Sequence, residues 1–330
     1  MKKDQSVETL RGLAIILMVA GHVIGDASYN GMKVADDSLL RYVYYTFQFL
    51  RMPLFTVISG YVYALRPADE TNTLVFLKGK TRRILLPFLT FGTLQYIFRC
   101  IVPGINKPAV FSHIWKIFIF TFDQFWFLQS IFLVFIFVSL LERYHILSNL
   151  KSYAIILGIA AVLYFFRNNV TTVFSFDGFL YLLPFFLLGL GINRYLSIFR
   201  KNYIRITFVT LLVLGITVQQ LIWFSIIPEP GKHLYNTLAL TIGVSGTITL
   251  FYLKKPMTFL AGLGYYSYGI YLMHVFGTAS SRIFFVRMGI ENNLIIFLLS
   301  LGFGLALPVL AELIIMKNRY LKLMFLGLKR

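Results

Sequence analysis

The stretch VETLRGLAIILMVAGHVIG, residues 7–25, is an apolar run long enough to cross a bilayer, yet it carries two ionisable side chains. Arg11 lies near its start, and His22 lies eleven residues further on, well inside the run. On an α-helix this spacing turns the two side chains by only about 20° and separates them by about 16 Å along the axis. They therefore share one helix face. An ionisable side chain at such depth is costly in lipid, which makes it a candidate functional residue.

A structural interpretation of the same stretch is also open. Arg11 can extend its guanidinium to the membrane surface while its aliphatic stem stays among the apolar side chains. His22 can be a core residue that bonds to a neighbouring helix. Residues 7–25 alone do not decide between a functional pair and two structural residues.

The composition predicts an all-α, polytopic transmembrane helical bundle. Of 330 residues, 58% are hydrophobic and 13% are charged, whereas soluble domains have about 25% charged residues. The mean hydropathy is +0.75. The net charge of +18 comes from short clusters of Lys and Arg between apolar runs, a pattern typical of membrane topology and not of nucleic-acid binding. Cys100 is the single cysteine, so neither an intrachain disulfide nor a zinc cluster is expected.

About ten apolar runs are long enough to span a membrane, and we expect a single membrane-embedded domain over residues 1–330. The N-terminal sequence has no small-residue cleavage site after a short apolar core, which predicts an uncleaved first helix. The expected spans are residues 9–25, 40–64, 84–102, 124–141, 153–167, 178–193, 204–227, 235–253, 260–285 and 292–316.

The distribution of basic residues predicts the orientation of these spans. With ten spans, 20 Lys and Arg residues lie on the side of the termini and 9 on the other side, leaving out Arg11 and Arg51. The positive-inside rule then places both termini in the cytoplasm. Arg11 is expected at the cytoplasmic surface and His22 beyond the midplane, so a path along their shared face would lead inward from the cytoplasm.

A second candidate feature is LKGKTRRILLPF, residues 77–88, on the predicted cytoplasmic side. Lys80, Arg82 and Arg83 place three cations within four residues. Such a cluster suits phosphate groups, either of lipids or of a soluble cofactor. The same charges also serve to anchor any cytoplasmic helix end, so the cluster alone leaves both interpretations open.

The run FQFLRMPLFTVISGYVYAL, residues 47–65, contains another intramembrane cation. Arg51 is expected in the outer half of its helix, near the depth of His22. Pro53 is expected to remove a backbone donor inside that spanning helix. Arg51 is therefore a further candidate for the site.

Aromatic and amide side chains gather near the predicted outer interface in FDQFWFLQSIF, residues 122–132. Trp126 is most simply a residue of the aromatic belt. Trp126 and Gln129 are also of the types that bind sugar rings, which makes them candidate substrate-binding residues.

A second intramembrane histidine lies in GLGYYSYGIYLMHVF, residues 262–276. His274 has Tyr271, a further candidate substrate-binding residue, on the same helix face at i−3. Its predicted depth also lies beyond the midplane, matching that of His22. Two histidines at one depth on different helices favour a functional site over coincidence.

Taken in chain order, these motifs resemble the acyltransferase-3 family. The motifs are Arg11-Gly12 followed by His22, MPLF at 52–55, SGY at 59–61, K-x-x-R before Pro87, WFL at 126–128 and SYGIYLMH at 267–274. Members of this family are integral-membrane O-acyltransferases that modify carbohydrates with acyl-CoA as donor. The resemblance runs from Arg11 to His274 and covers most of the chain.

The resemblance implies roles for several residues. His22 matches the histidine held to be catalytic, with Arg11 as its paired arginine, while Lys80 and Arg83 match the basic pair linked to coenzyme binding. Lys stands where the family more often has Arg, which weakens a bidentate phosphate contact at position 80. Ile131 stands where one branch would have Glu. The chain therefore resembles the smaller exopolysaccharide and fucose O-acetylase branch.

These residues suggest a mechanism. Acetyl-CoA would dock from the cytoplasm with its phosphates on Arg11, Lys80, Arg82 and Arg83, and its pantetheine arm would follow the first helix. His22 would take the proton of a sugar hydroxyl as it attacks the thioester. The oxyanion needs hydrogen-bond donors, for which Arg51, Tyr271 and His274 are candidates.

Other features of the mechanism stay open. Asp26, four residues after His22, can orient the imidazole, cap the helix end or contact substrate. Direct transfer and an acetyl-histidine intermediate are both compatible with the sequence. No metal is expected, because two histidines with no carboxylate close to either of them provide few ligands for a metal ion.

The resemblance further implies a bacterial inner-membrane protein whose acceptor is an exopolysaccharide, capsule or lipid-linked glycan. Membrane lipids are expected around it, with polysaccharide synthesis or export machinery as partner and no nucleic acid. The alternative interpretations are a transporter or flippase for lipid-linked glycans and a non-catalytic assembly component. A transporter would be expected to show inverted repeats with interrupted spans in corresponding halves, and the sequence shows none.

Overall fold

The computed structural model describes residues 4–329, and its regular elements are helices throughout. Within this range two residues, Phe120 and Val173, form an isolated β-bridge, and there is no strand. The predicted all-α class is confirmed. Lys2, Lys3 and Arg330, which contribute to the predicted charge asymmetry, lie outside the described residues.

The contacts divide the chain into two compact units, each built from separated segments. Unit 1 comprises residues 1–51, 87–115 and 254–330, and unit 2 comprises residues 52–86 and 116–253. The main helices of unit 1 are α1 (Gln5–Ile24), α2 (Leu39–Phe47), most of α5 (Leu86–Ile101), α13 (Thr258–Tyr265), α14 (Ser267–Arg287), α15 (Asn293–Ile315) and α16 (Arg319–Leu326). Those of unit 2 are α3 (Arg51–Ala64), which begins at the last residue of unit 1, α4 (Thr73–Lys80), α6 (Lys116–Ile119), α7 (Trp126–Arg143), α8 (Leu150–Phe166), α9 (Phe176–Arg194), α10 (Leu196–Phe199), α11 (Asn202–Trp223) and α12 (Lys232–Leu253).

Eight helical segments among the described residues are long and apolar enough to cross a membrane. They are Gln5–Ile24, Thr73–Ile101, Asp123–Arg143, Leu150–Asn169, Phe176–Arg194, Asn202–Trp223, Lys232–Leu253 and Asn293–Ile315. Each overlaps one of the expected spans. The two other expected spans, residues 40–64 and 260–285, are each divided into two helices. The side of the membrane on which the termini lie stays a prediction.

A proline lies just after the interruption of the first of these two spans. In a continuous helix the nitrogen of Pro53 would have to face the carbonyl of Phe49, but proline has no N–H and its ring clashes with that carbonyl. The chain instead leaves α2 at Phe47 and begins α3 at Arg51. Pro53 therefore lies in the first turn of α3, where its missing donor costs nothing. The expectation that Pro53 sits inside a spanning helix was wrong.

In the second divided span the chain changes from α13 to α14 at Tyr266. Three glycines lie nearby, at 262, 264 and 269, and glycine weakens a helix interior. The result is a short helix, α13, that lies directly against α1.

Two glycines let α1 and α13 approach backbone to backbone. A Cβ atom at Gly12 would overlap the carbonyl oxygen of Leu260, and one at Gly264 would overlap the carbonyl oxygen of Glu8. A hydrogen bond also joins the two segments: the hydroxyl of Thr9 accepts it from the backbone N–H of Met257 at 3.0 Å. These contacts fix the first turns of α1, which carry Arg11.

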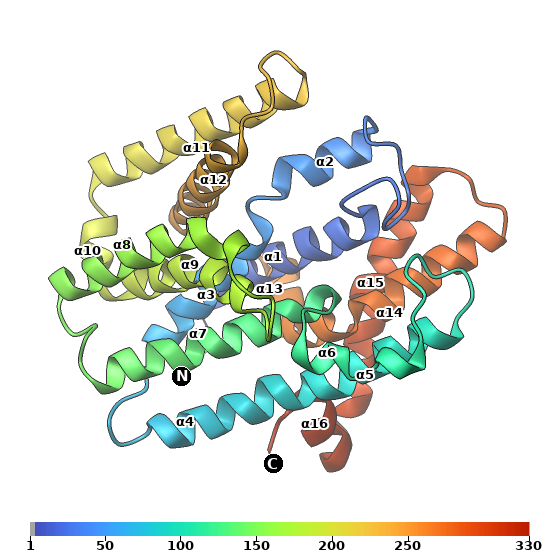
Figure 1. Ribbon diagram of the computed structural model, residues 1–330, viewed down its shortest axis with the longest axis horizontal. Helices are drawn as coiled ribbons and strands as arrows, with labels where there is room; N and C mark the ends of the chain where they lie inside the picture. The colour runs from blue at the N-terminus through green and yellow to red at the C-terminus, as the bar shows by residue number, and fades with distance from the viewer. Residues whose placement is uncertain (1–3, 330) are drawn as a thin grey trace. The chain divides into compact units, whose positions relative to one another are not determined.

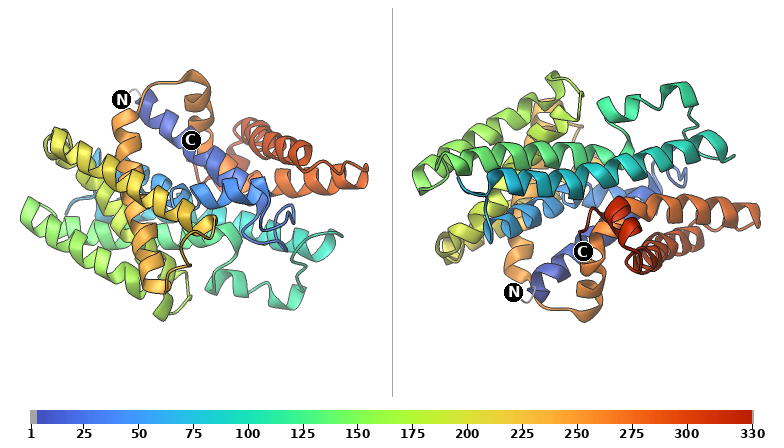
Figure 2. Two further views of the ribbon diagram at one scale, coloured as in Figure 1. Left: turned by 90° about the horizontal axis from the view of Figure 1, so that it is seen from above. Right: turned by 90° about the horizontal axis from the view of Figure 1, so that it is seen from below.

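The rest of α1 packs on the α14–α15 hairpin (Figures 1 and 2). Small residues bring these helices together as well: a Cβ at Gly304 would collide with Thr278 of α14 and lie 3.0 Å from Val19 of α1. α1 is therefore held along its length by unit 1, and α14 places His274 beside it.

Unit 2 is organised around α9, which is buried along most of its length. A Cβ at Gly60 of α3 would overlap the carbonyl oxygen of Phe186, and one at Gly189 of α9 would overlap that of Val57. α7 and α8 also pack on α9, and α11 and α12 form a hairpin (Figure 1).

Candidate functional site

The structure brings the two intramembrane histidines together inside unit 1. The ring centroids of His22 on α1 and His274 on α14 lie 4.9 Å apart, with the planes tilted by 48°. A direct N–H···N bond between two imidazoles places their centroids about 5 Å apart. The pair is therefore close enough to exchange a hydrogen bond through a small ring rotation.

The surroundings of His274 determine which of its nitrogens carries the proton. Its Nδ1 lies 2.9 Å from the carbonyl oxygen of Tyr271 and 3.2 Å from that of Ile270. Carbonyl oxygens only accept, so Nδ1 must be the donor. Nε2 of the neutral ring is then an acceptor, and among the described residues this buried atom has no hydrogen-bond partner.

The two side chains differ in how much of their surface the rest of the protein covers. His274 is fully buried, at 0% exposure. His22 is exposed, although the residues on both sides of it in α1, Gly21 and Val23, are buried. An accessible imidazole backed by a buried one is the arrangement expected of a base that meets a substrate.

Arg51 supplies a cation next to this pair. Its guanidinium lies against α1 at Gly21, where a Cβ atom would overlap Nη1. The ring of Tyr44 stacks on it, with 4.1 Å between Cζ and the ring centroid. In the described part of the chain, this guanidinium takes part in no hydrogen bond or ion pair. Its five N–H donors are therefore available to a ligand.

Arg11, expected to bind phosphate, is already paired. Its Nη1 lies 2.8 Å from Oε1 of Glu8, and the side chains are 25% and 4% exposed, respectively. Sequence reasoning missed Glu8, although the i−3 spacing on one helix was a signal for this pair. Glu8 thus neutralises part of the charge of Arg11, and an anion could bind only to the guanidinium N–H groups that do not contact Glu8.

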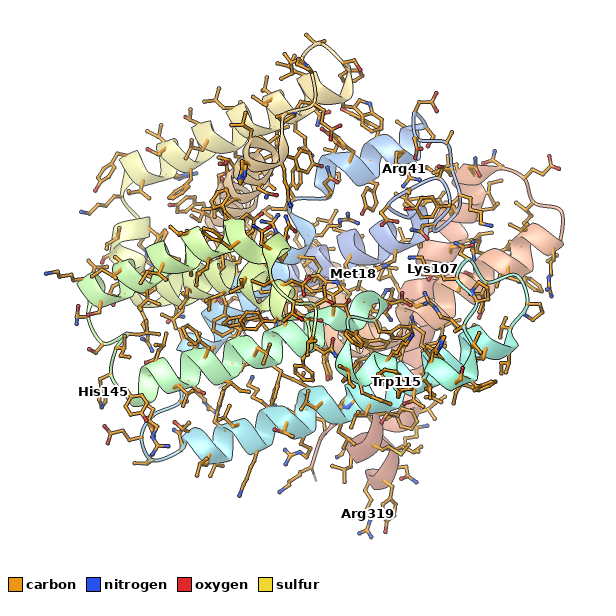
Figure 3. The ribbon with its side chains drawn as sticks, in the orientation of Figure 1. Met18, Arg41, Lys107, Trp115, His145 and Arg319 are labelled. Carbon is orange, nitrogen blue, oxygen red and sulfur yellow. The ribbon has the colours of Figure 1, made fainter. Side chains whose placement is uncertain are left out.

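The helix face between Arg11 and His22 is closed by packing. Ile15 and Met18 lie on that face and are 0% and 2% exposed; Met18 is labelled on α1 in Figure 3. The expected route of a pantetheine arm along this stripe is therefore filled by side chains in this structure. Access to His22 must come from another side of the imidazole.

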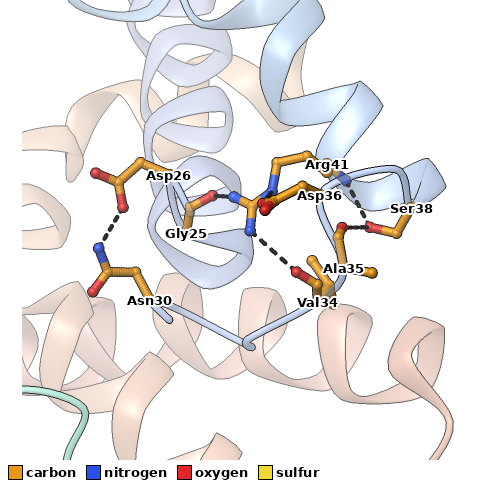
Figure 4. Close-up of polar contacts among 8 residues, drawn as sticks. All are labelled: Gly25, Asp26, Asn30, Val34, Ala35, Asp36, Ser38 and Arg41. Atoms are coloured by element: carbon orange, nitrogen blue, oxygen red, sulfur yellow. Dashed lines mark hydrogen bonds and ion pairs between the residues drawn. The ribbon is translucent and has the colours of Figure 1, made fainter. Parts of the chain in front are cut away.

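Asp26 does not contact the imidazole of His22. Its Oδ1 accepts a hydrogen bond from Nδ2 of Asn30 at 2.6 Å, in the turn that follows α1 (Figure 4). The end of α1 is held instead by Arg41 of α2, which is buried and donates to the carbonyl oxygens of Gly25 and Val34. Gly25 has a φ of +87°, which explains why glycine ends this helix.

The basic cluster of unit 2 lies on an unusual backbone. Residues Thr81–Leu85 form a π-helical turn between α4 and α5, and such turns are rare and frequent at functional sites. Arg83 is exposed and Arg82 is half-buried. Nζ of Lys80 lies over the ring of Phe135, 3.6 Å from its centroid. No pattern in the sequence indicates the π-helical turn.

The remaining predicted substrate-binding residues differ in accessibility. Trp126 is half-buried, with its ring 6.0 Å from that of Tyr181. Gln129 is fully buried and accepts from the hydroxyl of Ser175 at 2.8 Å. Tyr271 is buried, with its ring 6.4 Å from that of His274. Of the three, Trp126 is the one that a ligand can reach without a rearrangement.

No group of three His, Cys, Asp or Glu side chains that could hold a metal ion is found within residues 4–329. What unit 1 offers is an accessible imidazole, a buried acceptor behind it and a cation with unoccupied donors. These three side chains can perform acid–base chemistry and stabilise a developing anion.

The fold and these residues define a class: a multi-pass helical membrane protein with an intramembrane imidazole pair beside an arginine. The family model described as an acyltransferase domain, that of the acyltransferase-3 family, matches residues 4–313. The chain therefore belongs to the acyltransferase-3 family and is a membrane acyltransferase. Searches of curated proteins and of solved structures found no match to the chain.

Proposed function

We propose that this protein transfers an acetyl group from cytoplasmic acetyl-CoA to a hydroxyl of an exopolysaccharide, capsule or lipid-linked glycan at the bacterial inner membrane. The observation that carries the proposal is the trio of His22, His274 and Arg51 in unit 1. An accessible imidazole within 4.9 Å of a buried one, next to an arginine with unoccupied donors, suits acyl transfer.

His22 acts as the general base. A sugar hydroxyl has a pKa far above 7, so its oxygen attacks the thioester effectively only as a base removes the proton. The new C–O bond forms as the proton passes to the imidazole of His22. When the tetrahedral intermediate collapses, the C–S bond breaks and the imidazolium returns the proton to the leaving thiolate. Protons and charge therefore balance without another reactant.

His274 orients the base. The Nδ1–H of His274 donates to the carbonyl oxygens of Tyr271 and Ile270. Its Nε2 is therefore a hydrogen-bond acceptor, and its partner must be an N–H or O–H donor. A ring N–H of His22 is the nearest candidate. Holding that N–H directs the other nitrogen of His22 at the substrate, and the same bond strengthens when the imidazolium forms. His274 thus has the orienting role that a carboxylate has in a catalytic triad.

Arg51 stabilises the oxyanion. Its donors make no hydrogen bond in the described residues, so no existing contact must break when negative charge develops on the thioester oxygen. Tyr271 and His274, the other expected donors, are buried, and Nδ1 of His274 already donates to carbonyl oxygens, so we assign the oxyanion to Arg51.

We assign the phosphates of acetyl-CoA to basic residues on the predicted cytoplasmic side. Exposed Arg83 and half-buried Arg82 can meet its phosphates. Lys80 is stacked on Phe135, and Arg11 retains some donors beyond its pair with Glu8. Trp126 is a half-buried side chain among the predicted acceptor-binding residues, and aromatic faces stack on sugar rings.

The test is acetyl transfer by the purified full-length protein in detergent. Radiolabelled acetyl-CoA is mixed with a bacterial lipid extract that contains lipid-linked glycans, and label in the glycan and released thiol are measured. The wild-type protein is expected to transfer label, and His22→Ala to lose nearly all activity. The exposed His233 provides a matched control, and His233→Ala is expected to retain full activity.

Either of two results would overturn the proposal. One is full transfer by a folded His22→Ala protein. The other is glycan movement across vesicles without acetyl-CoA consumption, which would favour the transporter interpretation. Mass spectrometry of protein quenched during turnover separates direct transfer from an acetyl-histidine intermediate, because only the latter adds an acetyl group to His22.

A further inference from the structure

A glycine next to His22 leaves room for the side chain of Arg51. At Gly21 a Cβ atom would overlap Nη1 of Arg51 and lie 2.7 Å from Cζ and 3.4 Å from Cδ. The guanidinium therefore occupies the volume that any other residue at position 21 would fill. Since Gly21 immediately precedes His22, this contact brings Arg51 against the turn of α1 that carries the proposed base.

Tyr44 covers the other side of the guanidinium. Its ring centroid lies 4.1 Å from Cζ of Arg51, a separation typical of a cation–π contact. The same ring is 5.9 Å from Cζ of Arg41, and Arg41 is fixed by its bonds to the carbonyl oxygens of Gly25 and Val34. Tyr44 is thus part of the structure that closes the end of α1.

Arg51 needs such support for two reasons. It is the first residue of α3, and the positive end of a helix dipole disfavours a cation there. An arginine side chain also has many rotamers, and in the described residues no carboxylate or carbonyl holds this one. Its position is therefore set by shape, between Gly21 and Tyr44.

We propose that Gly21 and Tyr44 are positioning residues that hold the Arg51 guanidinium beside His22 while leaving its donors free for the transition state. This inference rests on the proposed function, because it assigns Arg51 the developing oxyanion. A hydrogen-bonding partner would have held Arg51 equally well but would have occupied the donors. Contact with a glycine and an aromatic face holds the guanidinium without that loss.

Kinetics of single variants give the first test, with purified full-length protein, acetyl-CoA and the bacterial lipid extract as acceptor. Arg51→Ala is expected to lower kcat by about 100-fold or more, as for loss of an oxyanion donor. Gly21→Ala and Tyr44→Leu are expected to lower kcat by about tenfold with little change in KM for acetyl-CoA. Tyr44→Phe keeps the aromatic face and is expected to restore most of the activity.

Double variants test whether Gly21 and Tyr44 act through Arg51. In an Arg51→Ala background, Gly21→Ala and Tyr44→Leu are expected to have no further effect on kcat. Two changes serve as controls for the substitutions themselves. Tyr29→Leu removes a tyrosine that is 69% exposed, and Gly262→Ala adds a methyl group where nothing lies within 4 Å; both are expected to leave kcat unchanged.

The outcomes separate this inference from the proposed function. Full acetyl transfer by a folded Arg51→Ala protein would remove the assigned role of Arg51 and the positioning inference with it, while the proposed acetyl transfer would stand. An inactive Arg51→Ala protein with fully active Tyr44→Leu and Gly21→Ala variants would overturn the positioning inference alone. So would effects that multiply in the double variants. If Gly21→Ala does not fold, the comparison of Tyr44→Leu with Tyr44→Phe decides the matter.

Discussion

Replacing His274 by leucine is expected to slow acetyl transfer while acetyl-CoA still binds. The variant removes Nε2, an acceptor that is buried close to the ring of His22 and has no hydrogen-bond partner within residues 4–329. A hydrogen bond to a charged group contributes about 1.5–3 kcal/mol, and this bond becomes charge-assisted when the imidazolium forms. At about 1.4 kcal/mol per tenfold in rate, kcat should fall between about tenfold and about 150-fold. The assay is initial velocity against acetyl-CoA concentration, which reports kcat and KM separately.

Glutamine at position 274 is the informative control. Its side-chain oxygen can reach the place of Nε2 and accept the same hydrogen bond, so His274→Gln is expected to keep much more activity than His274→Leu. Thermal unfolding in detergent establishes that both variants fold. Equal loss in the two folded variants would refute the orienting role, because it would show that the acceptor atom makes no contribution. A rise in KM without a fall in kcat would refute it as well.

Three further predictions concern other contacts. Gly12→Val is expected to lower the unfolding temperature markedly, because the valine side chain would meet the backbone of Leu260. Gly262→Val on α13 should change the unfolding temperature little. Equal unfolding temperatures of the two variants would contradict the close α1–α13 packing. Arg83→Glu should raise KM for acetyl-CoA more than that for the glycan, and the opposite ratio would place the phosphates elsewhere. Glu8→Gln leaves Arg11 without a charged partner and is expected to lower KM for acetyl-CoA if Arg11 contacts phosphate; an unchanged KM would argue that Arg11 is structural.

Much of the fold follows from the spacing and composition of the apolar runs. The run at residues 7–25 contains no proline and only three ionisable residues, Glu8, Arg11 and His22, and the structure has a continuous α1 at Gln5–Ile24 in spite of Gly12 and Gly21. The shared face of Arg11 and His22 is a direct consequence of this continuity. Residues 40–64 are divided near Pro53, whereas Pro184 and Pro308 lie inside the continuous helices α9 and α15, so a proline in an apolar run did not by itself predict a break.

The parts of the site that depend on tertiary contacts could not be predicted. The sequence shows that His22 and His274 have similar depths, but not that their rings lie 4.9 Å apart. The tautomer of His274 depends on where its Nδ1 points. The stacking of Tyr44 on Arg51 joins two helices through a turn whose path no periodicity reveals. The burial of Ile15 and Met18 likewise depends on what packs against α1.

Where the thioester binds is the central question, and it can be measured directly. A cryo-electron microscopy structure with a non-hydrolysable acetyl-CoA analogue would locate the thioester carbonyl. We predict that its oxygen lies within hydrogen-bond distance of Arg51 and that its carbon lies beside the accessible edge of the His22 imidazole. A carbonyl bound away from both side chains, with the His22 ring facing lipid, would contradict the account.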